Sequence, residues 1–200
     1  MKEIISKKEV AEIMKTKGEI LGDSIKVDLK YILFAEGKEG LQRLEDEMAR
    51  LGYSIKYKSI KRNDIYPAGM LSLEFTVIDK IFHYDKEKLE KMGRVEVNMS
   101  LSIIRFFARY FISIEKAAKE VQRMWAQHYN FGKIELKEYD MKKKYVLISL
   151  DDFKIHPSIC YVFKGYFAGI LEMIVGHKVS AEETKCVYRG DDHHEFLLKW

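Results

Sequence analysis

Apolar residues follow two different periods along this chain. In the first half they recur every three or four positions, as at Leu41, Leu44, Met48 and Leu51, which is typical of amphipathic helices. A capping box at Ser6 and Glu9 predicts the start of a first helix. Tyr53 to Ile60 alternates apolar and polar positions and is predicted to be a strand. Helices are expected over 6–15, 25–35, 41–51, 70–82 and 85–92, the last ending at Gly93.

The second half changes period twice more. It predicts helices over 98–112 and 114–129, a hairpin of strands over 134–139 and 145–150, a helix from Pro157 to Gly176, and two closing strands over 178–187 and 195–199. This order predicts an α+β fold in two layers, with helices packed on one face of a roughly four-stranded antiparallel sheet. With only two prolines and no Gly/Ser-rich linker, residues 1–200 are predicted to form a single domain with a mainly helical portion over 1–94.

Composition narrows the setting of the protein without defining its function. The chain is 47% hydrophobic, and its net charge of +4 is too small to indicate nucleic-acid binding. The N-terminus lacks the apolar core of a secretion signal, and two cysteines suit a reducing compartment, so we expect a cytoplasmic protein. The apolar stretches over 103–114 and 160–175 contain charged residues and are short for a bilayer, which predicts buried helices and no membrane span.

The two cysteines belong to a pattern that can hold a metal. Cys160 precedes a predicted helix, and Glu183, Cys186 and His194 follow that helix with the spacing E-x2-C-x7-H. Zinc accepts sulfur, nitrogen and oxygen donors in a tetrahedron, so these four residues are a candidate zinc set. The neighbouring residues His193 and Glu182 are alternatives. Adjacent residues on a strand face opposite ways, and the spacing favours His194.

The C-terminal part resembles the 4-vinyl reductase-type domain. The resemblance rests on Cys160, the segment 165–169 (Gly-Tyr-Phe-Ala-Gly), the segment 183–186 (Glu-Thr-Lys-Cys), Gly190-Asp191 and the segment 194–196 (His-Glu-Phe), and it covers roughly 95–200. This domain is a small-molecule-binding module, also found as the sensory domain of phenol- and xylene-responsive activators. It is similar in fold to the small subunits of the TRAPP trafficking complex.

The resemblance implies a structural zinc. In metal-bound relatives, a cysteine, a glutamate and two further cysteines hold the ion, and Cys160, Glu183 and Cys186 stand at matching positions. His194 replaces the last cysteine, an exchange that keeps a legitimate zinc ligand and lowers the negative charge of the site. Relatives are often dimers, so a homodimer is expected.

Aromatic residues cluster in the second half. They pack a core or line an apolar pocket, and clustering points to Phe107, Tyr110, Trp125 and Tyr129 as ligand-binding residues. The resemblance implies that the ligand is a small apolar or aromatic molecule or an acyl chain.

Three functions compete on these observations. The leading one is a zinc-containing small-molecule-binding domain with a sensory or regulatory role. The alternative is a protein-interaction or assembly module resembling TRAPP subunits, with a lipid-filled or closed cavity. The third is an enzyme or haem protein, with His83, His128 or His177 as a candidate axial ligand. No catalytic motif is present, and the carboxylates show no distinctive pairing beyond helix-surface charge, so a binding domain is favoured over an enzyme.

Overall fold

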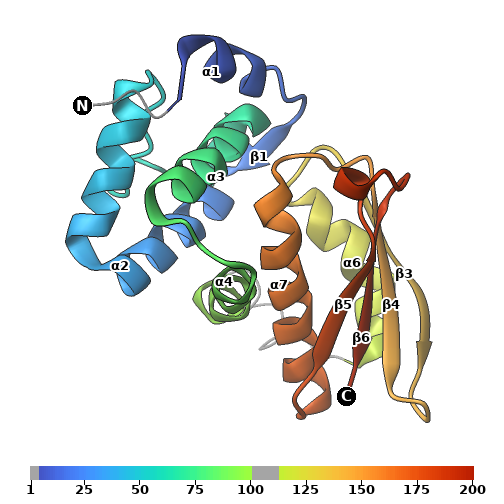
Figure 1. Ribbon diagram of the computed structural model, residues 1–200. Coiled ribbons are helices and arrows are strands. Elements are labelled where there is room, and N and C mark those ends of the chain that lie inside the picture. Colours follow the sequence, from blue (N-terminus) through green and yellow to red (C-terminus); the bar gives the residue numbers. More distant parts are fainter. Residues whose placement is uncertain (1–4, 101–112) are drawn as a thin grey trace.

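The computed structural model describes residues 5–100 and 113–200, and its N-terminal portion is mainly helical (Figure 1). Ser6 caps the first helix through a reciprocal pair of hydrogen bonds with Glu9, as predicted. The elements of this portion are α1 (Lys7–Ile13), β1 (Glu19–Leu21), α2 (Gly22–Arg50), β2 (Ile65–Pro67), α3 (Ala68–Phe82) and α4 (Lys86–Met99).

The C-terminal portion contains the sheet. Its elements are α6 (Ile114–Ala126), β3 (Lys133–Asp140), β4 (Tyr145–Asp151), α7 (Pro157–Val175), β5 (Ser180–Lys185), a 3-10 turn (Val187–Arg189) and β6 (His194–Lys199). The four strands are antiparallel in the order β3-β4-β6-β5, and α6 and α7 lie on the same face of the sheet (Figure 1). This arrangement confirms the predicted α+β fold with helices on one face of a four-stranded antiparallel sheet.

Helix α7 packs against α4 on one side and against the sheet on the other (Figure 1). The two helices cross where glycines allow their backbones to meet. A Cβ atom on Gly165 would lie 1.8 Å from the Glu90 carbonyl oxygen, and one on Gly93 would lie 1.9 Å from the Val162 carbonyl oxygen. The prediction that a helix ends at Gly93 is therefore wrong. This glycine serves close helix packing, and α4 continues to Met99.

Two further predictions in the N-terminal portion are corrected. The expected helices over 25–35 and 41–51 are parts of α2, which bends at Gly37, where φ is 71°. The strand expected over 53–60 is wrong, because that segment forms turns. Ile55 is fully buried there, and the Lys26 ammonium donates to the backbone carbonyl of Ile60, so a local plug replaces strand pairing. The helix expected over 98–112 lies mostly outside the described residues.

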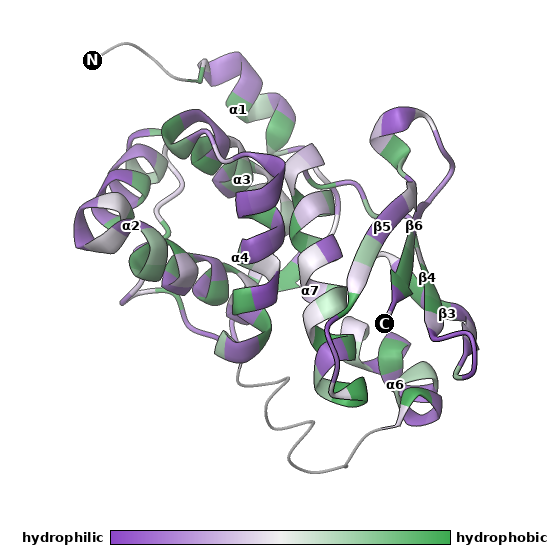
Figure 2. Cartoon of the chain, turned by 60° about the horizontal axis from the view of Figure 1, so that its bottom comes forward, coloured by the Kyte–Doolittle hydropathy of each residue, from purple (hydrophilic) through white to green (hydrophobic). Residues whose placement is uncertain are grey.

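Helix α7 is the one described helix that is long and apolar enough to cross a membrane by length and composition. More than half of its apolar window is buried inside the protein, and Ile159, Val162 and Phe167 belong to the core. Figure 2 shows α7 largely in pale and green tones, whereas purple charged positions interrupt the green on α4. Its position between α4 and the sheet is that of the buried helix predicted from sequence.

Candidate functional site

The four predicted metal ligands meet at the edge where α7 faces the terminal hairpin. Cys160 comes from the first turns of α7, Glu183 from β5, Cys186 from the residue after β5, and His194 from the first position of β6. One donor atom from each residue lies within 4.8 Å of the other three. The Cys160 Sγ is 3.7 Å from the Cys186 Sγ and 3.7 Å from the His194 Nδ1. A tetrahedral ion with Zn–S bonds of about 2.3 Å places two sulfurs roughly 3.8 Å apart.

Strand alternation selects which neighbours join the cluster. His194, Phe196 and Leu198 are buried on β6, so this face of the strand points at the helices. His193 lies on the other face, where its Nδ1 is 2.6 Å from the Asp192 carboxylate. Glu182 is exposed, whereas the Glu183 side chain exposes 8% of its surface. Within the described residues, the cluster therefore contains His194 and Glu183, and their neighbours lie outside it.

The ring of His194 is held in one orientation by its second nitrogen. Its Nε2 lies 3.0 Å from the Phe153 carbonyl oxygen, and because a carbonyl only accepts, Nε2 carries a hydrogen and donates it. A backbone carbonyl on the second nitrogen is a usual partner of a metal-binding histidine. The Nδ1 of His194 then faces the Glu183 Oε1 at 3.0 Å. Two atoms with lone pairs face each other there, so a proton or a cation must lie between them.

The loop between β5 and β6 is tied down around the cluster. The Cys186 backbone N–H donates to the Asp191 carboxylate at 2.7 Å, and Gly190 takes a positive φ of 98° to close the turn. Arg189 donates to the Glu183 backbone carbonyl at 2.8 Å. Burial raises the pKa of Cys160 and of Cys186, and the nearby Glu183 charge adds to both effects. The cluster thus concentrates acidic groups that a cation would stabilise in their charged forms.

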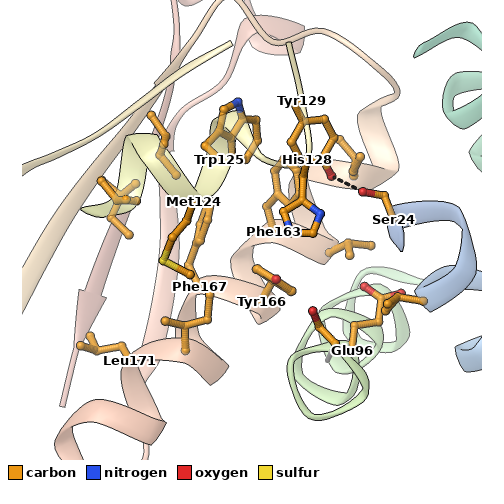
Figure 3. Close-up of a pocket in the computed structure, with 18 of the residues that line it drawn as sticks. Ser24, Glu96, Met124, Trp125, His128, Tyr129, Phe163, Tyr166, Phe167 and Leu171 are labelled. Carbon is orange, nitrogen blue, oxygen red and sulfur yellow. Dashed lines mark hydrogen bonds between the residues drawn. The ribbon is translucent and has the colours of Figure 1, made fainter. Parts of the chain in front are cut away.

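A cavity of about 200 Å³ lies between the helices and the sheet (Figure 3). Trp125 and Tyr129, two of the four predicted ligand-binding residues, line this cavity, with ring centroids 4.4 Å apart. Phe107 and Tyr110, the other two, lie outside the described residues. The Trp125 indole N–H donates to the Phe131 carbonyl at 2.9 Å, and the Tyr129 hydroxyl is 3.4 Å from the Ser24 hydroxyl. Both aromatic side chains are therefore fixed by polar contacts.

The cavity is apolar at one end and acidic at the other. Figure 3 shows Met124, Phe167 and Leu171 on one side and Ser24 and Glu96 on the opposite side. Two carboxyl groups line the acidic end, from Asp28 on α2 and Glu96 on α4. Glu74 on α3 is completely buried, and its charge raises the pKa of Glu96.

These carboxyl groups correct the expectation that acidic residues only decorate helix surfaces. Asp28 exposes 6% of its surface, Glu96 4% and Glu74 none. A signal for two of them is present in the sequence. Glu74 interrupts the apolar run from Met70 to Ile78, and Asp28 lies between Val27 and Leu29 on the apolar face of its helix. A charged residue among positions that must be buried is the pattern that would have identified them.

Comparison with known proteins places a family on the C-terminal part. Residues 150–199 match the 4-vinyl reductase (V-4-R) domain family. This match confirms the resemblance to the 4-vinyl reductase-type domain over those residues, which include all four members of the cysteine–histidine cluster. An uncharacterized protein of Methanocaldococcus jannaschii is 35% identical over 74 residues, which are 34% of this chain and 42% of that protein. The matched stretch thus spans less than half of that relative.

Solved structures extend the likeness to most of the chain at the level of fold. An H-NOX protein from S. oneidensis in the Fe(II)NO ligation state superposes with a TM-score of 0.67 at 11% identity, covering 90% of this chain and 98% of that chain. A protein studied for heme redox potential and porphyrin distortion gives a TM-score of 0.63 at 12% identity, covering 90% and 100%. A trafficking protein particle complex subunit 3 from Naegleria fowleri, covalently bound to palmitic acid, gives 0.46 at 19% identity, covering 66% and 93%. A TM-score of 0.46 supports no inference about this chain.

Proposed function

We propose that this chain is a small-molecule-binding domain with a sensory or regulatory role, whose ligand occupies the cavity between α6, α7 and the sheet. The observation that carries the proposal is the cavity of about 200 Å³ with an apolar lining and a few polar groups at one end. Ligand sites combine an apolar body with few orienting polar groups in this way. A cavity of roughly 150 Å³ holds benzene, so this one suits a small aromatic or short aliphatic molecule. Trp125 and Tyr129 would contact that ligand.

Filling the cavity tests this proposal. Ala117 lines the cavity on α6, and the adjacent Ala118 does not line it. Ala117→Phe should abolish binding of a small alkylbenzene, measured by isothermal titration calorimetry, whereas Ala118→Phe should leave binding intact. Equal binding by both variants, or no binding by the wild type, would sink the proposal. Native mass spectrometry of gently purified protein adds a second outcome. A co-purified acyl chain that does not exchange would favour the assembly module with a lipid-filled cavity.

A haem ligand does not fit the described lining, although the H-NOX neighbours make it a natural question. His128 is the only histidine among the described lining residues, whereas His83 and His177 are exposed. The described lining also contains no lysine or arginine to meet the two carboxylates of a haem, and its polar end carries Asp28 and Glu96 instead. A porphyrin is several times larger than a benzene-sized ligand, which is the scale of this cavity. No haem chemistry is therefore assigned to this chain.

We also propose that Cys160, Glu183, Cys186 and His194 hold a structural zinc ion. The supporting observation is the His194 Nδ1 lone pair, which faces the Glu183 carboxylate while Nε2 donates to Phe153. Four protein donors complete a tetrahedron and leave no open position for an activated water, so the role would be structural. The ion would join α7 to the terminal hairpin and contribute to the free energy of folding.

The matched neighbours on the strands make a sharp test of the zinc proposal. Elemental mass spectrometry should find about one zinc per chain in the wild type, because the cluster has one set of four donors. His194→Ala and Glu183→Gln should lower that content, whereas the controls His193→Ala and Glu182→Gln should retain it. Equal zinc content in the site variants and the controls would place any metal elsewhere. No zinc in the wild type would leave a protonated His194 as the group between Glu183 and Phe153.

Three further expectations belong to this proposal. We propose a single domain that acts as a homodimer and passes its signal to another protein. We place it in the reducing conditions of the cytoplasm, because its two cysteines are free in the structure. Light scattering coupled to size-exclusion chromatography, with and without ligand, would test the dimer. A monomer under both conditions would contradict it.

A further inference from the structure

The acidic end of the cavity contains a carboxyl pair. Asp28 and Glu96 are hydrogen-bonded to each other across the space between α2 and α4. Two carboxylates cannot bond directly, because both are acceptors, so at least one of the two holds a proton in this arrangement. That shared proton lies in surroundings from which solvent is almost excluded.

One oxygen of this pair still lacks a partner. The Glu96 Oε1 is buried and has no hydrogen-bond partner, although Glu96 lines the cavity and exposes only 4% of its surface. Behind the pair, neither carboxyl oxygen of Glu74 has a hydrogen-bond partner. Buried polar atoms are nearly always paired in folded proteins, so three unpaired acceptor oxygens in one region indicate a missing donor.

No cationic side chain supplies that donor from the described lining. Asp23, at the same end, already pairs with Arg62, and Glu47 elsewhere on α2 pairs with Arg50 at 2.7 Å. The fold therefore provides arginine partners for two buried acids on α2 and, among the described residues, none for Asp28 and Glu96. Such a difference within one helix indicates that the donor comes from outside the chain.

We propose that the ligand of this cavity carries an ammonium or similar cationic head group, bound by Asp28 and Glu96, on a small apolar body. This inference rests on the proposed ligand-binding function and specifies the class of ligand. The head would donate to the Glu96 Oε1 and displace the shared proton, and the body would extend toward Met124, Phe167 and Leu171. A carboxylate ligand of the same size would face the acidic pair and be rejected.

A series of three ligands with one body and different heads tests the proposal. Phenylpropylamine, phenylpropanol and phenylpropanoate share a ring and a three-carbon chain. Titration calorimetry on the full chain near pH 8 should show the amine binding about tenfold or more tighter than the alcohol, because a charge-assisted hydrogen bond replaces a neutral one. The carboxylate should bind more weakly than the alcohol.

Two carboxamide variants then locate the preference. Asp28→Asn and Glu96→Gln keep the size of the side chains and remove their charge, so the amine should lose most of its advantage while the alcohol still binds. Glu47→Gln is the matched control on α2, and it should preserve the preference for the amine. A preference that survives in both carboxamide variants would place the cation elsewhere and overturn the proposal.

The outcomes separate this inference from the broader function. Alcohol and amine binding with equal affinity would overturn the cationic head group and leave the ligand-binding function standing. Failure of all three probes to bind the wild type would count against both. If a carboxamide variant does not fold, the comparison of the three probes on the wild type still decides the question.

Discussion

The cysteine–histidine cluster and the carboxyl pair of the cavity both take acidic groups out of water, and they differ in how those groups are arranged. In the first, four donors converge within 4.8 Å, and the hydrogen bond from His194 Nε2 to Phe153 holds the ring in place. In the second, Asp28 and Glu96 touch each other, and Glu74 lies behind them without a hydrogen-bond partner. The first arrangement matches an ion that sits at one point. The second matches a donor that arrives with its own apolar body.

The two clusters also differ in how firmly the fold holds them. The cysteine–histidine cluster is built within one hairpin and the start of one helix. The carboxyl cluster of Asp28, Glu74 and Glu96 needs α2, α3 and α4 to stay in register, because each helix contributes one acid. A change in ligand at the carboxyl pair could therefore shift helices relative to each other, whereas a metal at the hairpin would lock one local contact. Such a division between a fixed and an adjustable site suits a sensory domain.

The largest expected effect comes from a change that affects both clusters at once. Gly165 lies on α7 between Cys160 and the cavity-lining Phe167, where α7 touches the α4 backbone. Gly165→Ala places a methyl group against the Glu90 carbonyl and must separate the helices, at a cost of roughly 3 kcal/mol or more. We expect thermal unfolding to shift down by roughly 10 °C, with loss of both zinc and ligand binding.

Gly169→Ala is the matched control one turn further along α7. Its methyl group would first meet a side-chain atom of Val97 at 3.1 Å, which can give way. The gain of roughly 1 kcal/mol in helix propensity from glycine to alanine offsets part of this contact. Equal melting temperatures for Gly165→Ala and Gly169→Ala would show that the helix crossing does not depend on this glycine.

The second effect should be confined to the cysteine–histidine cluster. Cys186→Ala removes one of four donors, so the protein should lose zinc together with several kcal/mol of folding free energy. A chelator should lower the melting temperature of the wild type to that of Cys186→Ala and have no effect on the variant. Amine binding by the variant below its melting temperature should persist, because the carboxyl pair lies on other elements. Retained metal and unchanged melting would contradict the zinc assignment.

The same contrast explains how far sequence reasoning reaches. The four residues of the cysteine–histidine cluster lie within 35 positions and are of types with few other uses, so spacing and residue type suffice to propose the set. Strand alternation then distinguishes His194 from His193 and Glu183 from Glu182. The hairpin and α7 were predictable for related reasons, because their periods are strong and Pro157 and Gly176 mark the ends of the helix.

The parts that sequence missed depend on long-range packing. Gly93 has the local signature of a helix end, and only the approach of α7 explains why the helix continues through it. The alternation over 53–60 is typical of a strand, yet no described strand lies beside it, and Ile55 fills the core from a turn instead. The acids at the cavity are brought together from three helices whose relative placement no local pattern encodes. Acidic residues are also common on helices, so their burial was visible only as interruptions of apolar runs.

The smallest effect sharpens the comparison through pH. Burial raises the pKa of Asp28 from its ordinary 3.8 to about 7, and it raises the pKa of Glu74 and Glu96 as well. A carboxyl group whose pKa is higher in the folded than in the unfolded state stabilises the fold at low pH, and this contribution is lost as pH rises through the folded value. The titratable groups around the pair are Glu74 on α3, Glu96 on α4 and, along the cavity, Asp23, His128, Tyr129 and Tyr166.

Asp28→Asn removes one of these protons and should therefore become more favourable, relative to the wild type, as pH rises. For Asp28 alone the difference between 3.8 and about 7 corresponds to at most roughly 4 kcal/mol, gained between about pH 4 and pH 7. Urea unfolding of both proteins across this range measures the difference, in which contributions from histidines and from the cysteine–histidine cluster cancel. Glu47→Gln, which loses an acid already paired with Arg50, should show no such gain. Parallel curves for Asp28→Asn and the wild type would mean that the pair already has a cation, and the carboxyl cluster would then resemble the metal-ligand cluster more closely than its geometry suggests.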